Sequence, residues 1–170
     1  NIKGVLSKSK IDAADIAALS LDAATHTAVI MDKDFNVLRP AIYWTDTRSV
    51  EEVSYLRENF SDVIDKEVLH KADTIWSLPE LLWIKNNEPE IWEKTEKILF
   101  AKDFVRHRLT GDYVTDYIEA EGSMMFDVNT LSWSKTLCEI LDFDTEKMPK
   151  IVKPTDIVGA VTKDAAALTG

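Results

Sequence analysis

Residues 15–32 read DIAALSLDAATHTAVIMD, in which two short apolar runs flank a bend of small and polar residues. The first run covers residues 16–21 and the second covers residues 28–31. Apolar runs of this length, bounded by small polar residues, are typical of buried strands. We therefore expect strands at 16–21 and 27–32 with a loop between them.

His26 is the residue of this loop that can change charge near neutral pH. Loops that follow buried strands often carry function, so His26 is a candidate binding or catalytic residue. A histidine beside an apolar strand is more often a packed, hydrogen-bonded residue. The residue type alone leaves both interpretations open.

The composition argues against several classes of protein. A length of 170 residues fits one domain or a large part of one. The net charge of −10 is unsuited to a phosphate backbone, so we expect neither nucleic acid nor a membrane as partner. The single cysteine, Cys138, excludes an internal disulfide, and its apolar neighbours indicate an inert, half-buried thiol in a reducing, cytoplasmic compartment.

The remaining pattern alternates strands with helices. A turn at 33–36 and a short strand at 41–44 predict an antiparallel hairpin with the second run. Ser49 with Glu52, and Ser77 with Glu80, have the spacing of capping boxes at two helix starts. Further strands are expected at 97–100, 124–128 and 157–162, and helices at 50–60, 61–71, 77–87, 103–109, 118–122, 135–141 and 164–168. This interleaving predicts an α/β fold.

Several common catalytic patterns are missing from the sequence. The five glycines are too dispersed for a GxGxxG or Walker loop, so these residues carry no recognisable phosphate cradle. The three histidines lack metal-ligand spacing, and we expect no metal site in the chain.

Polar side chains directly follow the strand expected at 41–44. Trp44, Asp46 and Arg48 could hold a polyol, because tryptophan faces stack on sugars while carboxylate and guanidinium groups bond to hydroxyls. Alternatively, Asp46 or Thr47 caps the next helix and Arg48 forms a surface ion pair. The acidic stretch 116–123 is a second polar segment, equally explained as a helix terminus.

Several collinear stretches resemble the FGGY carbohydrate kinases. ALSLDAATHTAVIMDKDFNVLRPAIYWTDTRS is similar to the family pattern GxSGQMHGxxxxD…GxxxRPAIxWxDxR. The similarity continues through SLPELLWIKNNEPEIW, FAKDFVRHRLTGDYVTDYIEAEGSMMFDV, LSWS, MPKIV and IVGAVT. It covers nearly all of residues 13–170, and the chain is xylulose kinase-like in these stretches.

The resemblance implies an actin-like ATPase, or ribonuclease-H-like, domain that forms part of a two-domain enzyme. Such enzymes transfer the γ-phosphate of ATP, with Mg²⁺, to a sugar or polyol hydroxyl. Residues 1–170 would be an incomplete N-terminal domain that supplies part of the acceptor-sugar site and is inactive alone. The phosphate loop is expected before Asn1, and the catalytic-base aspartate and the ATP domain after Gly170. A homodimer is compatible with this expectation.

The family's acceptor contacts fall on Thr25 and His26, on Trp44, and on Ile75. The sequence departs from the family at residues 22–25, where DAAT replaces the usual SGQM before the histidine. Ile75 is apolar where relatives carry arginine or tyrosine, and Glu121 occupies a position where the family usually has a small residue such as serine or alanine. These departures leave the identity of the sugar open. They also leave an alternative, a non-catalytic sugar-binding or regulatory domain that retained the fold.

Overall fold

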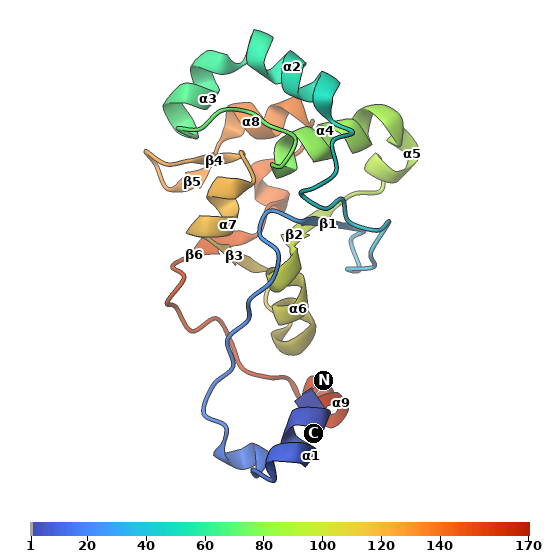
Figure 1. The fold of residues 1–170 in the computed structure, drawn as a ribbon, viewed down its shortest axis with the longest axis vertical. Helices are drawn as coiled ribbons and strands as arrows, with labels where there is room; N and C mark the ends of the chain where they lie inside the picture. The colour runs from blue at the N-terminus through green and yellow to red at the C-terminus, as the bar shows by residue number, and fades with distance from the viewer. Residues whose placement is uncertain (1) are drawn as a thin grey trace.

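The computed structural model describes residues 2–170 as α-helices interleaved with three two-stranded sheets (Figure 1). The helices are α1 (Ile2–Ser9), α2 (Val50–Asn59), α3 (Ser61–Glu67), α4 (Ser77–Asn87), α5 (Pro89–Trp92), α6 (Ala101–Thr110), α7 (Tyr117–Gly122), α8 (Lys135–Ile140) and α9 (Lys163–Thr169). The strands are β1 (Ala28–Met31), β2 (Lys97–Phe100), β3 (Val114–Asp116), β4 (Phe126–Asp127), β5 (Ser132–Trp133) and β6 (Lys150–Val152). Short 3₁₀ helices cover Ala13–Asp15 and Thr145–Lys147.

The antiparallel pair of β1 and β2 lies at the centre of the larger part of the molecule (Figure 1). Ala28 pairs with Phe100 and Met31 with Lys97. Successive side chains of a strand point to opposite faces, and here both faces are covered, so all four residues of β1 are buried. This explains why β1 reads as a continuous apolar run and not as an alternating one.

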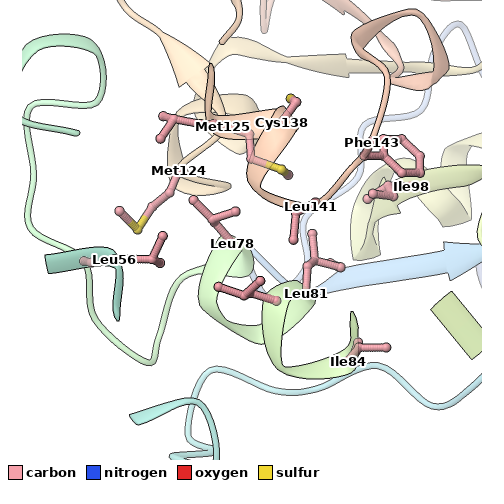
Figure 2. Close-up of a cluster of buried hydrophobic side chains, with 14 of the residues drawn as sticks. Leu56, Leu78, Leu81, Ile84, Ile98, Met124, Met125, Cys138, Leu141 and Phe143 are labelled. Atoms are coloured by element: carbon pink, nitrogen blue, oxygen red, sulfur yellow. The ribbon is translucent and has the colours of Figure 1, made fainter. Parts of the chain in front are cut away.

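The main core lies on one face of this pair, between α4, α8 and β2. Leu78 and Leu81 of α4 meet Leu141 and the residues that follow α7, Met124 and Met125 (Figure 2). A smaller cluster of Val29, Met31 and Leu99 fills the opposite face and packs against partly buried residues, among them Phe104 of α6. The two clusters together fix β1, and with it the loop that precedes β1.

The two remaining sheets are small. β3 and β6 pair in parallel, with Thr115 opposite Ile151, and β4 and β5 form an antiparallel hairpin in which Phe126 pairs with Trp133. The strand expected at 124–128 is therefore present but short. Residues 132–133, in the segment that follows it, form β5.

Helices α1 and α9 lie together, away from the main body, at the lower end of Figure 1. Two extended segments, one before β1 and one after β6, join them to the rest of the chain. Contact with the body includes the backbone bond from Thr162 N–H to the carbonyl of Leu109 in α6, 2.9 Å long.

Three predicted strands are wrong. Residues 16–21 are extended but exposed, with Leu19 51% accessible, and residues 157–162 include Ile157 at 96%. Neither segment has a partner strand within residues 2–170, and a strand needs a neighbour to satisfy its backbone groups. Residues 41–43 form no strand, and the chain turns at Trp44 and Thr45, where Asp46 N–H donates to Tyr43 O.

The hairpin predicted after β1 is confirmed only at its turn. The Asp32 carboxylate accepts bonds from the backbone N–H groups of Asp34 and Asn36, which closes residues 33–36. Beyond the turn, pairing is limited to the bridge between Met31 and Val37 and the bond from Leu38 N–H to Ile30 O.

Both predicted capping boxes are wrong. Ser49 precedes α2 with ψ 25°, outside the extended conformation from which a capping hydroxyl reaches the first turn, and its Oγ is buried and unpaired within the described residues. Ser77 lies inside α4, because Trp76 occupies the position before the helix. The Ser77 hydroxyl instead bonds outside its own helix, to the loop before β1.

Cys138 is completely buried, not half-buried as expected. Burial raises the pKa of its thiol to about 12, which keeps it protonated and unreactive at neutral pH. Among the described residues, no helix combines the length and apolarity that a membrane span requires.

Candidate functional site

His26 lies in the loop directly before β1 and is held by two distant segments of the chain. Its φ is 60°, in the left-handed region that side-chain-bearing residues rarely adopt. Its backbone N–H donates to Glu119 Oε2 of α7 at 2.9 Å, and its carbonyl accepts from the Ser77 hydroxyl of α4 at 2.5 Å. Contacts from α4 and α7 therefore fix a conformation that the loop would not favour by itself.

The imidazole of His26 is half-buried, with its two nitrogens in different environments. Nδ1 is buried without a hydrogen-bond partner in the described part of the chain. Nε2 is not among the buried unpaired atoms and forms no hydrogen bond within residues 2–170, so it is the nitrogen open to a ligand. Gly122 provides the space for the ring, because a Cβ at that position would lie 1.7 Å from Nδ1.

His26 is held in its neutral form. Burial, and then the nearby His70, lower its pKa below the ordinary value of 6.5. A neutral imidazole can donate or accept one hydrogen bond at its free nitrogen. Nε2 is therefore suited to a ligand hydroxyl.

Trp76 packs between two imidazoles. Its ring centroid lies 4.8 Å from that of His26 and 4.2 Å from that of His70. His70 Nε2 lies 3.0 Å from Glu121 Oε1, outside hydrogen-bonding geometry. Ile75, the residue before Trp76, is 37% exposed. Trp76 thus brings the segment 75–76 against the ring of His26.

A buried charge network lies behind Glu119. The Lys102 ammonium is 2.5 Å from Asp116 Oδ2 and 3.0 Å from Asp103 Oδ1, whereas it is 4.0 Å from Glu119 Oε1. Burial by itself raises the pKa of Asp116, but the bonds to Lys102 more than offset it and lower that pKa below its usual value. Asp116 also caps α7 by accepting from the N–H groups of Ile118 and Glu119.

Trp44, Asp46 and Arg48 form a separate group on the turn before α2. Asp46 Oδ1 accepts from the backbone N–H and Nε of Arg48, and Oδ2 lies 2.7 Å from Nη2. The guanidinium of Arg48 covers the Trp83 ring of α4 at 4.7 Å. The Asp46 and Arg48 side chains satisfy each other, which is the ion pair of the alternative interpretation, and Trp44 is half-exposed beside them.

Glu80 lies beneath this ion pair on α4, one turn after Ser77. It is 2% exposed, and its Oε1 has no partner within the described residues. Burial, and then the charge of Asp46, raise the pKa of Glu80 to about 9, although Arg48 and Arg39 oppose the shift. Glu80 is therefore a neutral carboxyl at pH 7.

The structure locates each residue predicted from sequence. His26 and Ile75 lie at one group, with Thr25 exposed on the same loop, and Trp44, Asp46 and Arg48 lie at the other. Two open hollows, of about 420 and 460 Å³, are lined by other residues. Sequence reasoning missed four residues that contact His26: Trp76, Ser77, Glu119 and Gly122. The polar stretch 116–123 is both a helix terminus and a contact of the His26 loop, so its composition was the one signal that pointed to Glu119 and Gly122.

Residues 2–170 do not fit a metal site. Within them no group of three or more histidine, cysteine or carboxylate side chains could hold a metal ion.

Comparison with protein families shows to which family the chain is related. All 170 residues match the N-terminal domain of the FGGY family of carbohydrate kinases. The chain belongs to this family. The FGGY expectation drawn from the collinear stretches is thereby confirmed.

Individual FGGY relatives differ in their substrates. The chain is 34% identical to the xylulose kinase of Bacillus subtilis over 166 residues, covering 98% of this chain and 33% of that protein. It is 32% identical to the glycerol kinase of Thermococcus onnurineus, and the match covers 96% of this chain and 34% of that protein. Among solved structures, the ligand-bound xylulose kinase of Lactobacillus acidophilus superimposes with a TM-score of 0.87 at 28% identity, over 99% of this chain and 34% of that one.

These FGGY relatives confirm the α/β, actin-like fold class expected from the sequence. The chain spans about a third of the length of the relatives it matches. These relatives are named for different substrates, xylulose and glycerol, so the shared fold does not by itself identify a ligand for this chain.

Proposed function

We propose that the protein containing residues 1–170 phosphorylates a hydroxyl of a sugar or polyol. The observation that carries this proposal is the placement of His26, whose neutral imidazole presents Nε2 from a loop fixed by α4 and α7. Membership of a carbohydrate kinase family, with xylulose and glycerol kinases among the relatives, supports the same reaction.

The described residues would act on the acceptor side of the reaction. His26 Nε2 would bond to an acceptor hydroxyl, and the exposed Thr25 hydroxyl would provide a second polar contact. Trp44 and Ile75 would offer apolar surface to the carbon skeleton. Asp46 and Arg48 would hold the turn that carries Trp44, since each is already bonded to the other. In phosphoryl transfer such positioning is a large part of what the protein contributes.

The donor side is proposed to lie outside these residues. ATP and Mg²⁺ would bind on the phosphate loop and the second domain, and the base aspartate would come from the same remaining part. Residues 1–170 would then be an incomplete N-terminal domain, inactive alone. We propose a cytoplasmic enzyme, compatible with a homodimer, with a xylulose-like sugar as the first acceptor to test.

A second candidate function is a non-catalytic sugar-binding or regulatory domain. It is favoured by one observation, the replacement of the family's residues before the histidine by Asp22, Ala23, Ala24 and Thr25. Both functions predict binding of a sugar, but only the first predicts turnover.

Sugar-dependent ADP release distinguishes the two. The full-length protein is assayed with ATP, Mg²⁺ and a panel of xylulose, gluconate, glycerol and related acceptors, with the 170-residue chain in parallel. We expect turnover by the full-length protein with one acceptor class and none by the 170-residue chain. Sugar binding without turnover by the full-length protein would support the regulatory alternative, and turnover by the short chain would refute the assignment as a fragment.

A further inference from the structure

The peptide groups on both sides of His26 are bonded to side chains that are remote in the sequence. Glu119 Oε2 accepts from the N–H on one side, and the Ser77 hydroxyl donates to the carbonyl on the other. Gly122, one turn of α7 after Glu119, leaves the space that the imidazole occupies. Three residues from two helices thus determine where a residue in the left-handed region places its ring.

Glu119 is the unusual member of this set. It is completely buried, and a buried carboxylate is costly unless charges or hydrogen bonds compensate it. Its Oε1 has no hydrogen-bond partner within residues 2–170, so the bond from His26 N–H is its one direct hydrogen bond there. Burial raises the pKa of Glu119, whereas the bond from His26 N–H lowers it and so favours the charged form.

The charge of Lys102 does not explain why a carboxyl group is buried at Glu119. Asp116 and Asp103 already lie 2.5 and 3.0 Å from the Lys102 ammonium, whereas Glu119 is 4.0 Å away. Asp116 and not Glu119 caps α7. The shortest polar contact of Glu119 is therefore with the His26 loop.

We propose that Glu119 is a positioning residue for the acceptor site, which holds His26 so that Nε2 faces the acceptor hydroxyl. Ser77 and Gly122 complete the arrangement by fixing the carbonyl and the ring. The link to the acceptor rests on the proposed function, whereas the control of His26 by Glu119 does not. The test therefore has one readout for each.

The first readout is the magnetic resonance of the His26 ring in the full-length protein without ligands. Histidine is labelled at Cε1, and the His26 signal is assigned with His26→Gln. Glu119→Met replaces the carboxylate with a side chain of similar size that has no oxygen to accept the bond from His26 N–H. Glu119→Gln keeps an oxygen that can accept this bond. We expect Glu119→Met to move the His26 signal and its titration midpoint, and Glu119→Gln to leave the signal close to that of the wild type.

The second readout is acceptor kinetics. Glu119→Met is expected to raise the acceptor KM, or lower kcat, about tenfold, with the ATP KM within about twofold of the wild type. Glu119→Gln should have acceptor kinetics much closer to those of the wild type than Glu119→Met. Glu52→Met is the matched control, because Glu52 is also buried and bonded to a side chain, Asn86, but does not contact His26.

The outcomes separate the two claims. An unmoved His26 signal in Glu119→Met, or equal acceptor effects in Glu119→Met and Glu52→Met, would overturn the positioning role. A moved signal in a protein that turns over no acceptor would support control of His26 and refute the kinase function instead. If Glu119→Met does not fold, Ser77→Ala is compared with Ser54→Ala, whose hydroxyl bonds to a carbonyl within α2, and an unmoved His26 signal in Ser77→Ala overturns the proposal.

Discussion

At the scale of single residues, the sequence predicted His26 as a candidate but could not predict what holds it. The spacing of Ser77 and Glu80 matches a capping box, yet the Ser77 hydroxyl bonds to the carbonyl of His26, 51 positions away. Glu119 lies 93 positions from His26. Contacts at such separations depend on the fold, so no local pattern reveals them.

Glu80 gives a prediction at this scale. Its pKa is raised to about 9 in the folded protein, so the folded state keeps a proton that the unfolded chain loses above its ordinary pKa of 4.5. Stability should therefore fall as the pH rises from about 4.5 to about 9. Glu80→Gln removes this dependence and should stabilise the protein at pH 7 by about 3 kcal/mol, from about 1.36 kcal/mol for each pH unit between 4.5 and 7.

Urea unfolding of both proteins across pH 4–9 measures the effect of Glu80→Gln. Below pH 4.5 the two should be nearly equal, which provides an internal control. A destabilised variant at pH 7, or parallel pH profiles, would show that Glu80 is ionised in the fold.

At the scale of elements, helices were predicted more reliably than strands. The periodicity and stop signals of α2, α4 and α6 lie within each segment. The strands at 97–100 and 27–32 were also predicted. They pair with each other and are buried on both faces, and such burial gives the apolar runs that sequence reasoning detects. The segments 16–21 and 157–162 have similar apolar residues but no partner strand in the described part of the chain, and apolar content alone does not make a strand.

The end of α6 offers a prediction at this scale. Gly111 has φ 80° and follows the last turn, with open space around a Cβ, so backbone strain is the cost of a side chain there. Gly111→Ala should destabilise α6 by about 1 kcal/mol, and Gly111→Asn by less. The matched control is Gly4→Ala inside α1, also in open space, which should stabilise its helix by about 0.5–1 kcal/mol.

Amide hydrogen exchange in each helix measures these two glycine variants. The opposite signs are the diagnostic result. Destabilisation by both substitutions would mean that side-chain crowding, and not backbone conformation, sets the cost.

At the scale of the whole molecule, α4 connects the two groups of candidate residues. Its first residue, Ser77, and the residue before it, Trp76, contact His26, and its next turn carries Glu80 under the Asp46–Arg48 pair. The buried face of the same helix, with Leu78 and Leu81, anchors it in the main core (Figure 2). This core helix therefore sets the relative position of both groups.

The central claim is that His26 contacts the acceptor, and its most direct test is the kinetics of His26→Ala in the full-length protein. His107→Ala is the matched control, because His107 also packs on an aromatic ring, that of Phe35 at 4.1 Å, away from the candidate site. We predict that His26→Ala lowers kcat/KM for the acceptor at least tenfold, about 1.4 kcal/mol, with the ATP KM unchanged and His107→Ala close to wild type. Unchanged acceptor kinetics in His26→Ala, or equal losses in the two variants, would contradict the account and leave His26 as a packed structural residue.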